Sequence, residues 1–261
     1  MRSFGELMSF MLSGNWCGQP LHNDDDWKLV QDLFTKHYPN QDGSPDVIPK
    51  KVHQIWLGSK IPSKYDRIRS TWQSYHPDWE YKLWVDADVA EFQMRNASIF
   101  NRASNLGAKS DIFRYEILYR FGGVYVDIDF ECIQSFNDLL YLDFFTGTGY
   151  NETPTWFNGL IACTPSHPIL ESLVNELRCP IGSGWDGMSH NTGPYYFSEI
   201  VSRHLRGNEG KRVVFPAAFF YPVSNAIRGM IREDTEQTRE YVKQHLLPET
   251  KCVHLWYCSW Q

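Results

Sequence analysis

Gly122-Gly123-Val124-Tyr125-Val126-Asp127-Ile128-Asp129 is the stretch of this sequence that says most about its fold. Two glycines precede a short apolar run, and the run ends in two carboxylates that lie two residues apart. Because side chains alternate across a β-strand, we expect Asp127 and Asp129 to share one face with Tyr125, while Val124, Val126 and Ile128 enter a core. Two carboxylates on one face repel each other unless a cation lies between them, and oxygen ligands suit hard divalent ions. The stretch therefore predicts a metal site at the end of a strand.

A helix is predicted directly before this strand, from Ala108 to Tyr119, and the two glycines end it. Asp111 and Arg114 are three residues apart, so they share one face of the helix. Such an ion pair contributes little at a protein surface, but the residues around this pair are apolar and the helix leads straight into the acidic strand. We therefore expect both side chains near the strand's acidic end. There a carboxylate can accept sugar hydroxyls and a guanidinium can bind phosphate.

Strands and helices alternate along the first half of the chain, which is typical of an α/β sheet. The sequence predicts strands at 51–57 and 81–85 and helices at 65–75, 170–177 and 196–205. Before them, Asp24-Asp25-Asp26 and the spaced apolar residues that follow indicate a capped helix. Asn40–Pro49 has the composition of a linker. We therefore predict an N-terminal helical extension (1–46) and a main domain (47–261).

Composition narrows the functional classes. The 261 residues carry a net charge of -6 and no long basic run, which gives no support for nucleic-acid binding. No apolar run is as long as a membrane span, so we expect no transmembrane segment. The six cysteines form no CxxC pair, which disfavours structural zinc and favours buried thiols in a reducing compartment. These features predict a soluble, cytoplasmic protein.

Several blocks of the chain, taken in order, resemble the signature of family 32 glycosyltransferases, the Och1-like enzymes that carry a DxD motif. A similar block occurs in the large clostridial glucosylating toxins. The resemblance covers about residue 47 to the end and rests on Ile48–Gly58, His76–Trp84, Ser110–Arg114, Arg120–Asp129, Asn158–Ala162 with His167-Pro168, Thr192-Gly193-Pro194, and the tail residues His254, Ser259 and Trp260.

This resemblance implies a GT-A fold, in which helices flank a Rossmann-like mixed sheet. It also implies a retaining transfer of a hexose from a UDP- or GDP-linked sugar to a glycan, lipid or protein acceptor, with Mn²⁺ or Mg²⁺ as cofactor. Eukaryotic Och1-like enzymes usually carry a Golgi membrane anchor, and this sequence shows none. For that reason a cytoplasmic location is expected rather than the Golgi lumen.

The resemblance also assigns roles to single residues. On the donor side, Trp56 would stack on the base, Asp111 and Arg114 would contact the sugar and its phosphate, and Tyr125 would line the pocket. Asn158 would lie near the anomeric carbon, and Ser259 and Trp260 would close over the diphosphate. On the metal side, Asp129 would bind the cation directly and Asp127 through water, while also contacting the donor. His254 would be the second protein ligand, because imidazole suits Mn²⁺.

Three alternatives compete with this reading. A haloacid-dehalogenase-type phosphatase also places Asp-x-Asp after an apolar strand, but it expects Thr or Val where this chain has Glu131. A structural calcium site would need more oxygen ligands than Asp127, Asp129 and Glu131 supply. The remaining alternative is a catalytically inactive module that binds a nucleotide sugar without turning it over.

Overall fold

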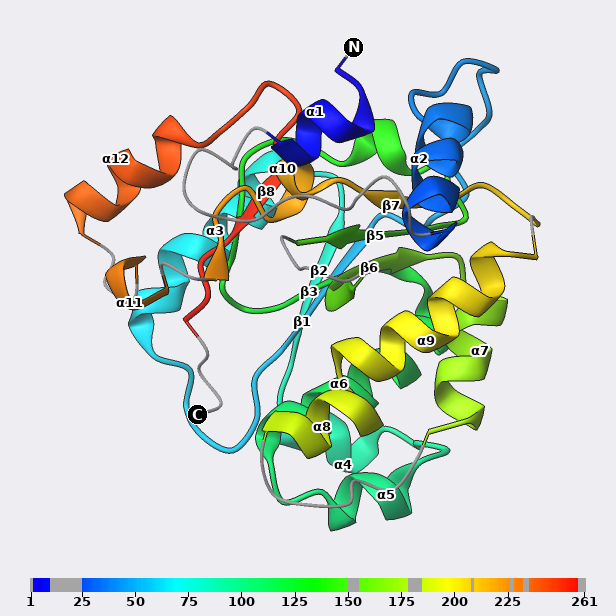
Figure 1. The fold of residues 1–261 in the computed structure, drawn as a ribbon. Helices are drawn as coiled ribbons and strands as arrows, with labels where there is room; N and C mark the ends of the chain where they lie inside the picture. Colours follow the sequence, from blue (N-terminus) through cyan, green and yellow to red (C-terminus); the bar gives the residue numbers. More distant parts are fainter. Residues whose placement is uncertain are drawn as a thin grey trace.

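A computed structural model describes residues 2–9, 25–149, 155–177, 185–207, 209–225, 228–231 and 235–257, and the structural statements below refer to these residues. At its centre lies a six-stranded sheet in the order β2-β1-β3-β6-β5-β7 (Figure 1). The strands are β1 (Lys51–Ile55), β2 (Glu80–Trp84), β3 (Gly123–Val126), β5 (Phe144–Thr148), β6 (Trp156–Cys163) and β7 (Arg212–Phe215). β1 is parallel to β2 and β3, β6 is antiparallel to β3 and β5, and β7 is parallel to β5. The predicted mixed α/β sheet is confirmed.

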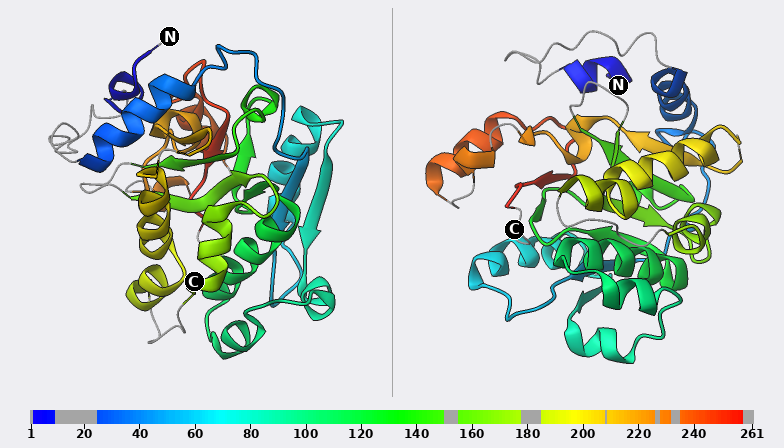
Figure 2. Two further views of the ribbon diagram at one scale, coloured as in Figure 1. Left: turned by 90° about the vertical axis from the view of Figure 1, so that its right-hand side faces the viewer. Right: turned by 60° about the horizontal axis from the view of Figure 1, so that its bottom comes forward.

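Helices cover both faces of this sheet. On one side lie α6 (Leu106–Phe121), α7 (Pro168–Asn175), α8 (Trp185–Asn191) and α9 (Pro194–Leu205), and on the other α1 (Phe4–Ser9), α2 (Asp25–His37) and α10 (Ala217–Phe220) (Figures 1 and 2). The other helices are α3 (Asp66–Tyr75), α4 (Asp86–Glu91), α5 (Ala97–Arg102), α11 (Arg228–Ile231) and α12 (Glu236–Gln244). The helices predicted near α2, α3, α6, α7 and α9 are all present. None of the described helices is both long and apolar enough to cross a bilayer.

Two glycines make the reversal from α6 into β3. Gly122 and Gly123 have φ angles of 59° and 93°, a region that side chains other than hydrogen disfavour. A Cβ on Gly122 would lie 2.6 Å from the backbone nitrogen of Pro165, and one on Gly123 would lie 2.8 Å from the carbonyl oxygen of Lys51. The tight turn inserts β3 between β1 and β6, so β1 and β3 end at the same edge of the sheet.

The acidic stretch is a turn and not the end of a strand, contrary to the prediction. β3 ends at Val126. The backbone N–H of Phe130 donates to the carbonyl oxygen of Asp127 at 3.1 Å, which closes a turn over 127–130. Strand alternation is therefore the wrong reason for the closeness of Asp127 and Asp129, because the turn brings the two carboxylates together. Ile128 is buried, as expected, but in a second apolar cluster separate from the main core.

A two-stranded antiparallel ribbon follows this turn. It pairs β4 (Phe130–Cys132) with β8 (Cys252–His254), and its register places Phe130 opposite His254. The two rings stack with centroids 4.5 Å apart. The backbone N–H of Leu255 extends the pairing by donating to the carbonyl oxygen of Asp129 at 3.0 Å. The ribbon thus brings His254 to Asp129 across 125 residues of sequence.

The N-terminal helices pack into the main apolar core. Trp27 of α2 contacts Trp156 of β6 edge to face, with centroids 5.4 Å apart, and Phe34 contacts Phe215 of β7 at 5.8 Å. Trp27 and Phe34 are each only 1% exposed, so α2 packs into the same core as the sheet. The division into an extension (1–46) and a domain (47–261) stays a prediction.

Candidate active site

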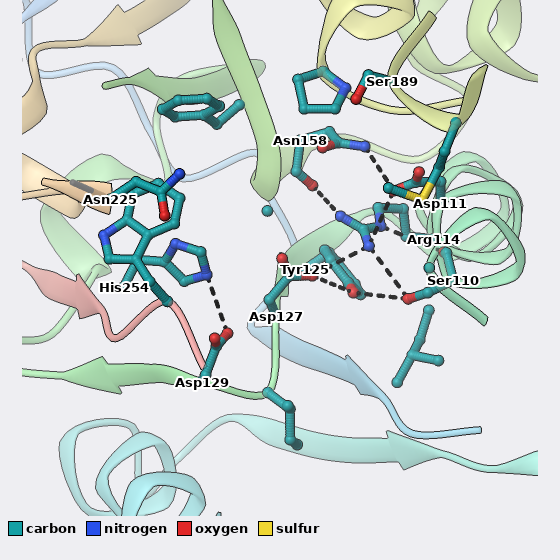
Figure 3. A pocket seen from close by; sticks show the side chains of 18 of the residues that line it. Ser110, Asp111, Arg114, Tyr125, Asp127, Asp129, Asn158, Ser189, Asn225 and His254 are labelled. Atoms are coloured by element: carbon teal, nitrogen blue, oxygen red, sulfur yellow. Dashed lines mark hydrogen bonds and ion pairs between the residues drawn. The ribbon is translucent and has the colours of Figure 1, made fainter. Parts of the chain in front are cut away.

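A cavity of about 860 Å³ lies where β1 and β3 end, a size usual for small-molecule sites. Its wall brings together eight of the ten residues that the sequence suggested: Trp56, Asp111, Arg114, Tyr125, Asp127, Asp129, Asn158 and His254. Figure 3 shows seven of them, all except Trp56, in two groups, one around Arg114 and one around Asp129. The remaining two, Ser259 and Trp260, lie outside the described residues.

The first group is a buried ion cluster. The Arg114 guanidinium lies 3.2 Å from the carboxylate of Asp111 and 3.2 Å from that of Asp127. It also donates to the carbonyl oxygen of Asn158 at 2.6 Å and stacks 4.5 Å above the Tyr125 ring. The side chains of Arg114 and Asp111 are only 5% and 7% exposed, so the pair is not the weak surface interaction that spacing alone allows.

Burial and neighbouring charge set the ionisation of this cluster. Burial raises the pKa of Asp111 to about 7, against the opposing charge of Arg114. Burial also raises the pKa of Asp127, and the Asp129 charge adds to this, while Arg114 opposes it. Burial alone would lower the pKa of Arg114, but Asp127, Tyr125 and Asp111 raise it above its usual range. The guanidinium therefore stays charged between two carboxylates that are reluctant to ionise.

The second group is a cluster with the chemistry of a metal site. Asp127, Asp129 and His254 each offer a ligand atom, and these atoms lie within 4.8 Å of one another. His254 Nε2 lies 3.1 Å from Asp129 Oδ1, and the backbone N–H of Tyr257 donates to Asp129 Oδ2 at 2.8 Å. Burial would raise the pKa of Asp129, but His254 and the Tyr257 N–H outweigh it and hold that pKa below its usual range. Two carboxylates and one imidazole suit Mn²⁺, so the residues fit a divalent cation.

The two carboxylates of the DxD motif have different surroundings. Asp129 is held by the C-terminal segment, through His254 and Tyr257. Asp127 accepts a hydrogen bond from the Tyr125 hydroxyl at 2.8 Å and faces Arg114. The Asp127 side chain is 28% exposed to the cavity, whereas that of Asp129 is 7% exposed. The geometry makes Asp127 the carboxylate more accessible to a ligand.

Trp56 follows β1 and lines the cavity beside Leu57 and Ser59. Its indole N–H donates to the carbonyl oxygen of Ser59 at 2.9 Å, and its ring packs at 5.2 Å and 51° against Tyr65. Trp56 is only partly buried, so part of its ring is available to the cavity. This position suits the base-stacking role, which stays a prediction.

Sequence reasoning missed Thr192 and Tyr115, which together with Asn158 form the support of Asp111. The Thr192 hydroxyl donates to Asp111 Oδ2 at 3.0 Å, and the Asn158 amide donates to Asp111 Oδ1 at 2.8 Å. The Tyr115 hydroxyl donates to the carbonyl oxygen of Thr192 at 2.7 Å and accepts from Asn158 at 3.0 Å. A signal for Tyr115 existed, since it lies four residues after Asp111 on the same helix face. Thr192 was noted only as part of a motif.

Trp256 is a further residue that the sequence did not single out. It has φ of 52°, which is rare for a bulky residue. Its indole packs 4.1 Å from the His254 ring and donates to the carbonyl oxygen of Val223 at 2.7 Å. The left-handed backbone at Trp256 turns the chain so that the Tyr257 N–H meets Asp129. No pattern in the sequence indicates such a turn.

The chain is similar in sequence to known proteins. Residues 62–145, which include the DxD motif, match the model of the glycosyltransferase sugar-binding region containing DXD motif. Inositol phosphoceramide mannosyltransferase 1 of Schizosaccharomyces pombe is 32% identical over 142 residues, which are 52% of this chain and 44% of that protein. Mannosyl phosphorylinositol ceramide synthase SUR1 of Saccharomyces cerevisiae is 27% identical over 205 residues, which are 73% of this chain and 53% of that protein. The chain thus spans about half the length of these relatives.

The fold has a counterpart among solved structures. The PaToxG glycosyltransferase superposes with a TM-score of 0.53 at 17% identity, covering 70% of this chain and 79% of that structure. At this identity the likeness speaks for the fold, a mixed sheet flanked by helices of the GT-A type. Residues 62–145 thus carry the sugar-binding region of DXD-motif glycosyltransferases, set in a fold of the GT-A type.

Proposed function

We propose that the chain transfers mannose from GDP-mannose to a hydroxyl acceptor, with retention at the anomeric carbon and with Mn²⁺ or Mg²⁺ bound. UDP-linked hexoses are the alternative donors. The observation that carries the proposal is the shared cavity: the buried Asp111–Arg114–Asp127 cluster and the Asp127–Asp129–His254 cluster line one site. The choice of mannose rests on the names of the relatives, several of which are mannosyltransferases.

Each group of residues has a task in this chemistry. Asp127, Asp129 and His254 would hold a divalent cation, which would supply positive charge for the leaving diphosphate. Arg114 adds a fixed positive charge that needs no reorientation, because Asn158 and the two carboxylates already hold it. The transferred sugar becomes oxocarbenium-like as its bond to the diphosphate breaks.

Asp111 is suited to orient the sugar. A carboxylate has about four acceptor positions, and Asn158, Thr192 and Arg114 occupy three of them on Asp111. The remaining position can accept a sugar hydroxyl. The acceptor hydroxyl then attacks from the face that the diphosphate leaves, and a phosphate oxygen takes its proton.

A lipid acceptor is favoured over a glycan or protein by the rim of the cavity. Leu106 and Tyr195 both line the cavity and are 41% and 47% exposed, so the opening carries two accessible apolar side chains. An acceptor with an apolar portion would cover them. The printed names of the relatives, inositol phosphoceramide mannosyltransferases among them, agree with this chemistry.

Slow donor hydrolysis tests the function without an acceptor. The protein is incubated with Mn²⁺ and, in turn, GDP-mannose, UDP-glucose, UDP-galactose and UDP-N-acetylglucosamine, and release of the nucleoside diphosphate is measured. We expect release of GDP from GDP-mannose. This release should stop when the Mn²⁺ is chelated, and it should be absent in the Asp129→Asn variant. Binding of a nucleotide sugar without hydrolysis or transfer, including transfer to inositol phosphoceramide in detergent micelles, would instead favour the inactive binding module.

A further inference from the structure

Asp111 is held by a buried network that extends away from the cavity. The network joins α6 to the segment between α8 and α9, and it consists of Asp111, Tyr115, Asn158 and Thr192. Thr192 is fully buried, and its single O–H donates to Asp111 Oδ2 at 3.0 Å, with the carbonyl oxygen of Met188 farther away at 3.3 Å. Thr192 therefore has no surface of its own to offer a ligand.

The two oxygens of Asp111 are held from opposite directions. Asn158 and Arg114 approach Oδ1, whereas Thr192 approaches Oδ2. Without the Thr192 hydroxyl, the carboxylate would keep contacts on one oxygen only and could rotate about its bond to Cβ. The oxygen that would move is Oδ2, which retains an acceptor position for a sugar hydroxyl.

The position of Thr192 is itself fixed by its surroundings. Tyr115, which is 1% exposed, donates to the Thr192 carbonyl oxygen at 2.7 Å. The next residue, Gly193, leaves room for this approach: a Cβ there would lie 3.0 Å from the Ser189 Cα and 3.5 Å from Asp111 Oδ2. Tyr115 and Gly193 thus hold the Thr192 hydroxyl at the carboxylate without touching the cavity's contents.

We propose that Thr192 is a positioning residue that fixes the Asp111 carboxylate, and through it the orientation of the donor sugar in the cavity. The inference rests on the proposed function, because it assumes that Asp111 contacts that sugar. It predicts that loss of the Thr192 hydroxyl impairs handling of the sugar while the nucleotide still binds. A hydrogen bond to a charged group is strong enough to change kcat/KM by about 10- to 100-fold.

Ionisation offers a second readout. Burial raises the pKa of Asp111 to about 7, and the hydrogen bond from Thr192 opposes this rise. The charged groups that face Asp111 are Arg114, which lowers that pKa, and Asp127, which raises it. Removing the hydroxyl therefore shifts the acid limb of the activity profile to higher pH, because more Asp111 is protonated at neutral pH.

The experiment compares Thr192→Val with Thr192→Ser, which keeps the hydroxyl. Thr250→Val serves as the matched control, since the Thr250 hydroxyl is fully buried, donates to the Ala218 carbonyl oxygen at 2.8 Å and lies outside the cavity wall. For each variant, kcat/KM for donor hydrolysis is measured across pH, and GDP and UDP affinities are measured by calorimetry. We expect Thr192→Val to lose about 10- to 100-fold in kcat/KM with a raised acid limb and unchanged nucleoside diphosphate affinity.

Two results would overturn the inference. One is a pH profile of kcat/KM for Thr192→Val that equals that of wild type, and the other is an equal loss of kcat/KM in Thr192→Val and Thr250→Val. Should Thr192→Val fail to fold, Tyr115→Phe weakens the same network from its other end and is expected to give the same pattern with a smaller loss. A wild-type protein that hydrolyses and transfers from no donor would contradict the proposed function itself. An active wild type with an unaffected Thr192→Val would contradict only the role of Thr192.

Discussion

Arg114 is the residue on which the charge balance of the site depends. Its guanidinium lies between two carboxylates, Asp111 and Asp127, that burial disfavours. Removing one member of a buried ion cluster leaves the others uncompensated and costs more than an exposed pair ever contributes. A diphosphate that approaches Asp127 would meet a positive charge already fixed in place. The cluster therefore explains how a cavity rich in carboxylates can accept an anionic ligand.

The two carboxylates of the DxD motif are expected to respond differently to substitution. Asp129→Asn removes the carboxylate that faces His254 and should weaken Mn²⁺ binding by at least roughly 100-fold, while Asn still accepts the Tyr257 N–H and the fold survives. Asp127→Asn should mainly raise KM for the donor. Direct Mn²⁺ titration by electron paramagnetic resonance, with exposed Asp32→Asn as control, separates the two. Equal Mn²⁺ affinities in both variants would refute the division of roles.

Much of the site could be predicted from single residues, because the sequence patterns that mark it are short-range. The spacing of Asp111 and Arg114 on one helix, and the doublet Asp127 and Asp129 behind a glycine turn, are short-range patterns that the structure brings to one cavity. His254 needed the family resemblance, because only the ribbon places it at Asp129. The support around Asp111 could not be predicted in the same way, since Thr192 joins it through packing of separate helices.

At the scale of elements, the α6–β3 turn decides where the acidic residues lie. Gly122→Ala should destabilise the protein by about 3 kcal/mol, because φ of 59° disfavours a side chain and the new Cβ would lie 2.6 Å from Pro165. Chemical denaturation measures the loss. Gly43→Ala is a suitable control, since it also has positive φ, 67°, but nothing within 4 Å of the added Cβ. Equal losses of unfolding free energy in Gly122→Ala and Gly43→Ala would show that crowding at Pro165 contributes nothing.

His53 ties three elements of the sheet together and predicts a pH dependence of stability. Trp84 Nε1 can only donate, so His53 Nδ1 accepts from it at 3.2 Å, and Nε2–H donates to the Gly122 carbonyl oxygen at 3.0 Å. Both nitrogens are thus used by the neutral ring. Burial lowers the pKa of His53 to about 4, from an ordinary value of 6.5. Protonation would put a hydrogen on Nδ1, directly against the Trp84 N–H.

The sign of this effect follows from proton uptake. Between pH 6.5 and about 4 the unfolded chain binds a proton at His53 and the folded chain does not, so stability falls as pH falls through this window. The full contribution is roughly 3 kcal/mol. His53→Gln keeps a donor for Gly122 but cannot be protonated, so its unfolding free energy should fall less between pH 7.5 and 4.5 than that of wild type. Exposed His190→Gln serves as the control. If His53→Gln and wild type lost the same unfolding free energy between pH 7.5 and 4.5, the assignment of this effect to His53 would be contradicted.

At the scale of the whole molecule, the cavity wall is assembled from segments far apart in the chain. β1, α6, β3 and β6 contribute to one part of it, and β8 contributes His254. The strands β1 and β2 and the helices α2, α3, α6, α7 and α9 were predictable because apolar periodicity is local, whereas β5, β6 and β7 were not predicted. The strand order, the β4–β8 ribbon and the burial of the N-terminal helices were not, because each depends on contacts between residues far apart in sequence.

The N-terminal helices provide the test at this scale. Trp27 and Phe34 of α2 contact aromatic rings of β6, β7 and α10, so removing residues 1–46 would expose a large part of the apolar core. We expect the 47–261 fragment to be insoluble, or to lack near-ultraviolet circular dichroism and a cooperative thermal transition. Within the full chain, Trp27→Ala should cost about 3 to 5 kcal/mol, whereas exposed Asp32→Ala should change stability by less than about 0.5 kcal/mol. If the 47–261 fragment melted at the wild-type temperature, the N-terminal helices would be a separable extension. The apolar faces of β6 and β7 would then be stable without the cover that α2 provides.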